Sequence, residues 1–292
     1  MKTGFYPALG TPFDNCGNFL SGSFKRQIKD QLAAGAAGML VMGSMGIEPY
    51  IKESEHFKVA SAAVDAVHGE CPVLVGVMDN SITRILDRIE ALKGLKIDGV
   101  VATTPFYYSA SQEDLKRFFE KIAEVSPYPL YLYDLPVVTK TIITVETAEY
   151  LMGLDNIKGI KTGNIATARE LLRSEKKKDN FSVIFSGLDV FDIAYQYGIN
   201  MNLDGMFSCT PFTTGKMYRC LENGDISQAG RLLDQILALR NEFIQIGVFS
   251  GFTYAMNLLG YEGIFAPDYI YEFDESNYEK IRDCMKKYDM IQ

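Results

Sequence analysis

The chain has 292 residues, of which 47% are hydrophobic and 23% charged, so it has ample apolar material for one large core. Its formal net charge of -8 argues against nucleic acid or an anionic membrane surface as a partner, but does not exclude a small anionic substrate. No apolar run approaches the roughly 20 residues of a membrane span. Because Pro7, Gly10 and Pro12 interrupt any signal-peptide core, we expect a cytoplasmic protein.

The residues that usually hold metals or cofactors are sparse. The five cysteines are scattered and form no CxxC pair, which argues against a disulfide framework or a zinc site. His56 and His68, the two histidines, fall in predicted helices, and no paired acidic cluster accompanies them. The chain also lacks a P-loop and a dinucleotide-binding fingerprint. The sequence therefore predicts neither a metal nor an organic cofactor, and it weakens a metal-dependent aldolase as an alternative.

Short apolar segments rich in β-branched residues recur along most of the chain, each bounded by turn residues. Continuous apolar runs of this kind are typical of strands that are buried on both faces of a parallel sheet. The predicted strands begin at Phe5, Gly38, Pro72, Asp98, Pro129, Ile157, Ser182 and Leu203.

The stretches between these strands have the apolar spacing of helices, as Phe24, Ile28 and Leu32 illustrate. Thr144 and Asn164 are suitable N-cap residues for two of them. The predicted helices cover residues 22–34, 53–67, 82–95, 112–125, 145–152 and 165–175.

Alternation of eight strands with helices indicates βαβ units and a parallel α/β sheet. Eight units favour closure into a (β/α)8 TIM barrel, and an open doubly wound sheet is the alternative. From Asp225 onward the strand signal stops, and residues 226–247, 252–260 and 275–289 are predicted to be helical. We therefore expect a barrel over residues 1–224 that carries the active site, followed by a C-terminal helical extension over residues 225–292.

Lys161 is the most informative polar residue, because it ends the sixth apolar segment, where a barrel places its functional groups. Desolvation favours a neutral amine, which can attack a ketone and form a Schiff base. The resulting iminium stabilises the carbanion that remains when an adjacent carbon–carbon bond breaks. A strand-end lysine can equally pair with a carboxylate, and the segment alone leaves both interpretations open.

Two neighbouring strand ends add weaker signals. Tyr133 ends the fifth strand and could relay a proton in an aldol reaction, although a tyrosine that is simply packed is the commoner case. The loop Gly43-Ser44-Met45-Gly46 follows the second strand. Its glycines would let backbone N–H groups approach a substrate carboxylate, but a plain turn explains it as well.

Taken together, these motifs resemble the dihydrodipicolinate synthase/N-acetylneuraminate lyase family of class I, pyruvate-type aldolases. The resemblance covers essentially the whole chain, and the order and spacing of the motifs make it specific. Its elements are TPF at residues 11–13, GSMG at 43–46, TPFYY at 104–108, YDLP at 133–136, GIK at 159–161, SGLD at 186–189 and DG at 204–205.

The resemblance implies a Schiff base on Lys161 and a hydroxyl proton relay through Ser44, Tyr133 and Tyr107. The tyrosine that matches Tyr107 crosses a subunit interface in many members, which implies a homo-oligomer, usually a tetramer built as a dimer of dimers, or a dimer. The implied ligands are pyruvate, or another 2-oxo acid, and an aldehyde. The implied substrate-binding residues are Gly43, Met45, Gly187, Asp189 and Ser208.

The chain departs from both branches of this family. The synthase branch carries an arginine shortly after YDLP, where this chain has Val137-Val138-Thr139-Lys140, so a bidentate carboxylate contact is lost. Val190 replaces the acidic residue of the neuraminate branch, and Met45 and Ile47 change the loop after the second strand. These changes favour a divergent lyase that cleaves a 2-oxo sugar acid, N-acetylneuraminate-like or 2-keto-3-deoxy. The alternatives are a 4-hydroxy-tetrahydrodipicolinate synthase, a hydratase or dehydratase that uses the same Schiff base, and a non-catalytic 2-oxo acid-binding module.

Overall fold

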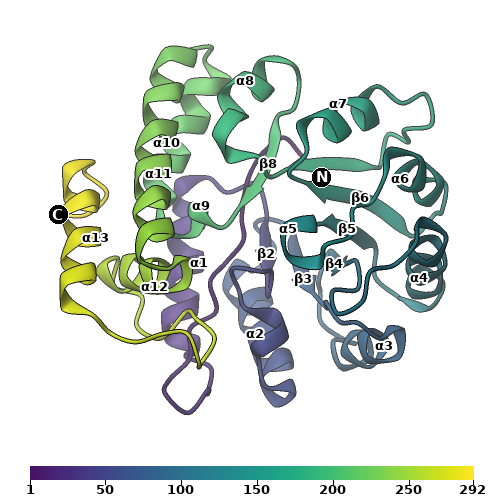
Figure 1. Ribbon diagram of the computed structural model, residues 1–292, viewed down its shortest axis with the longest axis horizontal. Helices are drawn as coiled ribbons and strands as arrows, with labels where there is room; N and C mark the ends of the chain where they lie inside the picture. The colour runs from purple at the N-terminus through teal and green to yellow at the C-terminus, as the bar shows by residue number, and fades with distance from the viewer.

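Eight parallel strands form a barrel with helices around it, in a computed structural model that describes residues 1–292 (Figure 1). The strands pair in the order β1-β8-β7-β6-β5-β4-β3-β2, and a single bridge between Ala8 and Leu40 brings β1 and β2 together. This confirms the predicted TIM barrel and excludes the open sheet. The strands are β1 (Gly4–Pro7), β2 (Met39–Val41), β3 (Val73–Gly76), β4 (Gly99–Thr103), β5 (Leu130–Asp134), β6 (Ile157–Thr162), β7 (Ser182–Phe185) and β8 (Met201–Asp204).

Several helices begin at a residue whose side chain accepts a hydrogen bond from a free N–H group of the first turn. As predicted, the Thr144 side chain accepts from Thr147 N–H, and Asn164 Oδ1 accepts from Ala166 and Thr167 N–H. The helices are α1 (Ser21–Ala34), η1 (Glu48–Tyr50), α2 (Glu53–Val67), α3 (Ile82–Ala91), α4 (Gln112–Val125), α5 (Pro136–Thr139), α6 (Val145–Met152), α7 (Ile165–Arg173), η2 (Leu188–Val190), α8 (Phe191–Gln196), α9 (Met206–Cys209), α10 (Pro211–Glu222), α11 (Ile226–Ile246), α12 (Val248–Leu258) and α13 (Glu275–Lys287).

The largest errors of the predicted elements lie near β8. The strand begins at Met201, and the residues after Gly205 form α9 instead of continuing the strand, because the Asp204 carboxylate accepts from Met206 N–H and starts a helical turn. Helices α8 and α10 were not predicted, although Pro211 at the first position of α10 is a recognised start signal. Helix α3 ends before the predicted residue 95, because the chain turns at Gly94, where φ is 90°.

The barrel interior is filled by side chains and is not a pore. Its inner cluster includes Tyr6, Tyr131 and Tyr133 beside smaller aliphatic residues. Glycines face the large rings: a Cβ at Gly38 would lie 2.4 Å from the Tyr6 ring, and one at Gly99 would lie 2.6 Å from the Tyr131 ring. Side chains therefore pack the interior below the carboxyl ends of the strands, the end at which barrel enzymes carry their functional groups.

The C-terminal helices lie on one side of the barrel, away from α3, α4 and α6 (Figure 1). Helix α11 packs against α10, α12 and α13. The same apolar core contains Phe5 of β1, Leu239 of α11 and Phe252 of α12, so the segment over residues 225–292 shares the outer core of the barrel. No helix combines the length and the apolar character needed to cross a lipid bilayer.

Candidate active site

Lys161 lies in β6 with its side chain directed into the mouth of the barrel. Its register partners are Tyr133 in β5 and Ile184 in β7, and both belong to the inner cluster. Paired residues of parallel strands point to the same face, so Lys161 points inward with them. Only 6% of Lys161 is exposed, and no carboxylate lies within ion-pairing distance of its amine. The structure therefore gives no support to a lysine that simply pairs with a carboxylate.

The Lys161 amine lies over the aromatic ring of Tyr133. The distance from Nζ to the ring centroid is 3.9 Å, which is a cation–π contact. Tyr133 is itself buried in the inner cluster. The structure thus brings together the two residues that the sequence assigned to nucleophilic attack and proton transfer.

The loop after β2 turns tightly at the carboxyl end of that strand. Ile47 N–H donates to the Ser44 carbonyl oxygen at 3.1 Å, and Thr11 Oγ1 donates to the Gly46 carbonyl oxygen at 2.8 Å. A Cβ at Gly46 would lie 2.9 Å from the Leu9 carbonyl oxygen, so the close approach of two backbone segments requires glycine there. Ser44 is half-buried, and the Met45 side chain lies against Gly205 at the end of β8. The loop therefore sits on the rim formed by β1, β2 and β8.

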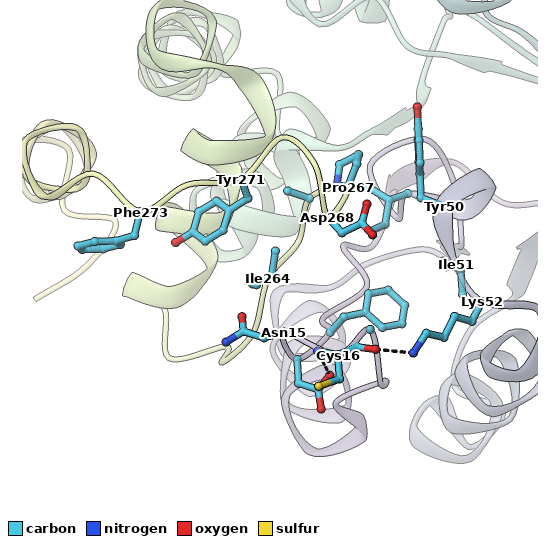
Figure 2. A pocket seen from close by; sticks show the side chains of 15 residues that line it. Asn15, Cys16, Tyr50, Ile51, Lys52, Ile264, Pro267, Asp268, Tyr271 and Phe273 are labelled. Carbon is cyan, nitrogen blue, oxygen red and sulfur yellow. Dashed lines mark hydrogen bonds between the residues drawn. The ribbon is translucent and has the colours of Figure 1, made fainter.

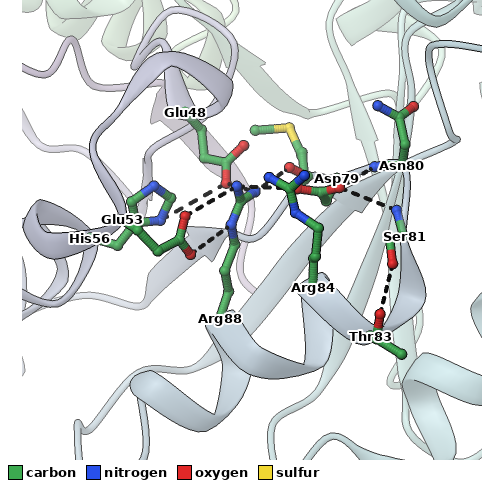
Figure 3. Close-up of polar contacts among 10 residues, drawn as sticks. Glu48, Glu53, His56, Asp79, Asn80, Ser81, Thr83, Arg84 and Arg88 are labelled. Carbon is green, nitrogen blue, oxygen red and sulfur yellow. Dashed lines mark hydrogen bonds and ion pairs between the residues drawn. The ribbon is translucent and has the colours of Figure 1, made fainter.

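A buried ionic cluster holds the residue that follows this loop (Figure 3). Glu48 Oε1 accepts from Arg88 Nη1 of α3 at 2.6 Å, and Arg88 also pairs with Asp79 at 3.2 Å and Glu53 at 3.2 Å. Burial raises the pKa of Glu48 to about 8 although Arg88 opposes the shift, while the surrounding carboxylates raise the pKa of Arg88. We take Arg88 as the fixed charge and Glu48 as the group that titrates, because the guanidinium stays protonated at every accessible pH.

Replacing Glu48 by glutamine is expected to flatten the pH dependence of stability. Between about pH 4.5 and 8 the folded state keeps the Glu48 proton that the unfolded chain releases, so stability is greatest below this window and falls as pH rises through it. The slope from this group is about 1.4 kcal/mol per pH unit. Thermal unfolding measured from pH 5 to 8 should show that Glu48→Gln loses less stability over this range than the unmodified protein does. Equal losses would contradict this, and Glu90→Gln, which changes an exposed carboxylate of α3, is the control.

Tyr107 lies outside the barrel mouth of its own chain. It is 77% exposed, and its ring packs edge-on against the exposed Tyr108 ring at 4.9 Å. The Asn80 side chain fixes this loop, because its Oδ1 accepts from the N–H groups of Phe106 and Tyr107 at 2.7 and 2.8 Å. The described chain therefore presents Tyr107 to the outside and does not bring it into contact with Lys161.

The residues expected to bind the remainder of the substrate have different surroundings. Asp189 lies exposed in η2 after β7, and Gly187 sits over the Phe185 ring, where a Cβ would come within 2.2 Å. Ser208 is completely buried in α9, and its hydroxyl donates to the Ala8 carbonyl oxygen at 2.7 Å. Ser208 is not proposed as a substrate ligand, because its only hydroxyl proton is engaged with the backbone.

Lys161 acts electrostatically on the carboxyl groups of Asp134 and Asp204, neither of which was predicted as a site residue. The Asp134 carboxylate accepts from Thr162 Oγ1 at 2.8 Å and from Ile143 N–H at 3.0 Å, so it ties β5 to the residue beside Lys161. Burial raises the pKa of Asp134 and of Asp204, and Lys161 opposes both shifts. An acidic residue directly after an apolar strand is the signal that could have identified both.

Two cavities lie near this site without enclosing it. One of about 470 Å³ lies between the segment after β1 and residues 264–273, with Phe13, Ile47, Tyr50 and Tyr271 among its lining (Figure 2). The other, of about 630 Å³, is lined by Asp134, Gly163, Ser186 and neighbouring residues at the ends of β5, β6 and β7. Neither Lys161 nor Tyr133 lines either cavity, and the second extends toward α6 and α7, so neither is assigned to the substrate.

A TIM barrel with an inward lysine at the end of its sixth strand, over a tyrosine of the fifth, has the arrangement of a class I aldolase. Comparison with known proteins agrees. The profile of the dihydrodipicolinate synthetase family matches residues 1–287. The chain therefore belongs to the dihydrodipicolinate synthetase family, and it is an enzyme of the class I aldolase type.

Several relatives have names that bear on the reaction. The chain is 33% identical over 238 residues to a 4-hydroxy-tetrahydrodipicolinate synthase of Kosmotoga olearia, covering 78% of this chain and 79% of the relative. It is 29% identical over 267 residues to a protein of the same name from Ligilactobacillus salivarius, covering 87% and 88%. A solved dihydrodipicolinate synthase from Thermotoga maritima superposes with a TM-score of 0.90 at 23% identity, over 100% of both chains. At that identity, the structural likeness shows the fold alone.

Proposed function

We propose that the protein is a pyruvate-dependent aldolase in which Lys161 forms the Schiff base. The supporting observation is the burial of Lys161 at the mouth of the barrel, with its amine free of any carboxylate and placed over Tyr133. The neutral amine attacks the keto carbon of pyruvate, and loss of water gives an iminium. Loss of a methyl proton then gives an enamine, whose carbon attacks the aldehyde carbon and forms the new bond.

Tyr133 is the acid and base of this proposal. Its hydroxyl gives a proton to the aldehyde oxygen as the carbon–carbon bond forms, and removes the same proton when the bond breaks. Ser44 assists the transfer, and the backbone of Gly43 and Met45 faces the pyruvate carboxylate. Hydrolysis of the iminium then returns the free lysine and releases the 2-oxo acid.

The aldehyde partner separates two candidates. Cleavage of a 2-oxo sugar acid, N-acetylneuraminate-like or 2-keto-3-deoxy, is supported by Val138, which is 56% exposed where the synthase branch carries its arginine. Condensation with an anionic semialdehyde, as in 4-hydroxy-tetrahydrodipicolinate synthase, is supported by the names of the relatives. The segment after β5 has no arginine that could meet a second substrate carboxylate where the synthase branch carries one, and this favours the first candidate.

A homo-oligomer, either a dimer or a tetramer, is part of the proposal. Tyr107 and Tyr108 form an exposed aromatic pair on the loop after β4. Large exposed rings of this kind are enriched at protein interfaces. In the proposed assembly Tyr107 enters the site of a neighbouring subunit and completes the proton relay with Ser44 and Tyr133.

Borohydride trapping with pyruvate tests the proposal. Hydride reduces the iminium to a stable secondary amine, so intact mass should rise by the pyruvate-derived increment and peptide mapping should place it on Lys161. Lys158 is the matched control, because it lies on the same strand but is partly exposed on the outer face. An adduct that persists in Lys161→Ala, or that forms equally on Lys158, would overturn the assignment.

A further inference from the structure

An ion pair at the mouth of the barrel joins the loop after β7 to helix α11 of the C-terminal extension. Arg240 Nη1 and Nη2 donate to separate oxygens of the Asp189 carboxylate, at 2.7 and 2.6 Å. Both charges act on the Asp204 carboxyl at the end of β8, as does the charge of Lys161. Because η2 follows β7 at the carboxyl ends of the strands, the Asp189–Arg240 pair lies at the same end of the barrel as Lys161, the lysine that is proposed to bind pyruvate.

The two partners differ in exposure. The Asp189 side chain is 64% exposed and that of Arg240 is 27% exposed, so the carboxylate faces the solvent and the guanidinium lies behind it. Each carboxylate oxygen accepts one hydrogen bond from Arg240 and has a second lone pair that can accept another. A carboxylate whose orientation is fixed in this way is a specific acceptor for hydroxyl groups of a ligand.

The charges at this rim disfavour a second negative group on the substrate. Asp189 cancels the charge of Arg240, and each terminal nitrogen of the guanidinium already donates one of its two N–H groups to Asp189. The Arg240 Nε atom is buried without a partner, so it does not offer an accessible donor. An anionic aldehyde would approach the exposed oxygens of Asp189 first, whereas a neutral hydroxylated aldehyde would donate to them.

We infer that Arg240 is a positioning residue that holds Asp189 to accept hydrogen bonds from an uncharged, hydroxylated aldehyde. The same pair selects against an aldehyde that carries a second carboxylate. The inference rests on the proposed Schiff-base reaction at Lys161, and it names the class of aldehyde that this reaction uses.

The test compares two aldehydes of similar size in condensation with pyruvate: neutral D-glyceraldehyde and anionic succinic semialdehyde. The unmodified protein should have the higher kcat/KM with glyceraldehyde. In Asp189→Asn the hydroxyl acceptor loses its charge and Arg240 is no longer neutralised. The ratio of the two kcat/KM values should then shift toward succinic semialdehyde by about tenfold or more.

Variants of Arg240 separate positioning from general damage. Arg240→Met should raise KM for glyceraldehyde about tenfold with kcat nearly unchanged, and Arg240→Lys, which can keep one hydrogen bond to Asp189, should recover part of the loss. Arg231→Met is the matched control on α11, because that guanidinium contacts only Gln228 and Ser227 of its own helix.

Pyruvate trapping on Lys161 is measured for every variant without aldehyde. It distinguishes failure of the proposed Schiff-base reaction from failure of the inference about Arg240 and Asp189. No adduct in the unmodified protein would overturn the proposed function and this inference together. Three outcomes, each with normal trapping, would overturn the inference and leave the Schiff base standing. They are a preference for succinic semialdehyde, no turnover of glyceraldehyde, and a ratio of kcat/KM values that Asp189→Asn does not change.

Discussion

Replacing Lys161 by arginine is expected to abolish turnover while leaving the barrel folded. A guanidinium keeps the positive charge over the Tyr133 ring but stays protonated and has no nucleophilic amine to offer. Loss of a covalent nucleophile typically costs a factor of about 10⁴ or more in kcat. Pyruvate consumption in the presence of an aldehyde gives the rate, and thermal unfolding reports the fold.

Lys158→Arg provides the comparison, because it changes the outward lysine of the same strand and should leave kcat within about twofold of the unmodified value. Turnover retained by Lys161→Arg would rule out the Schiff-base mechanism. If Lys161→Arg does not fold, Lys161→Met serves as the second variant. It removes the amine and its charge but keeps an unbranched side chain of related length.

Replacing Tyr133 by phenylalanine is expected to give the second-largest effect. The substitution keeps the ring beneath the Lys161 amine and removes only the hydroxyl, so binding should change little. General acid–base groups contribute about 10²- to 10⁴-fold, and a loss in this range is expected in kcat. Pyruvate should still be trapped on Lys161, because the amine remains in place.

The matched variant is Tyr131→Phe, one layer deeper on the same face of β5. Burial raises the pKa of Tyr131 to about 12, so this hydroxyl stays protonated and should contribute nothing to turnover. If Tyr133→Phe were as active as Tyr131→Phe, Tyr133 would only be a packing residue, and proton transfer would fall to Ser44 or the neighbouring subunit.

The barrel was predictable because its strands carry their own signal. The apolar runs at Pro129 and Ile157 give β5 and β6 almost without adjustment, since both faces of these strands are buried. The end of β8 was not predictable. Asp204 and Gly205 interrupt an apolar run, and the helical turn that follows depends on a single hydrogen bond from Met206 N–H to the Asp204 carboxylate. Short helices such as α8 likewise give too few residues for a period to emerge.

Lys161 and Tyr133 could be placed together from sequence, because each ends a strand and adjacent strand ends must meet. The contacts that orient the carboxylates around them could not be predicted from the sequence. Glu48 is held by Arg88 from α3, and Asp189 by Arg240 from α11. These partners lie far away in the chain on helices whose rotation no local pattern specifies, and an arginine on a helix surface is normally solvated.

The barrel closes through sparse pairing between β1 and β2. Only the Ala8–Leu40 bridge and the hydrogen bonds from Leu9 N–H to Leu40 and from Ala37 N–H to Phe5 cross this junction. The opposite wall, between β5 and β6, is paired along the whole of β5. Because local opening breaks the fewest contacts where strands are sparsely paired, we expect it at this junction and between β7 and β8, where a single residue pair is in register. The loop at Ser44 follows β2 at this sparsely paired junction, and Lys161 lies on β6 in the fully paired wall, so we expect the loop to open more readily than the strand that carries the lysine.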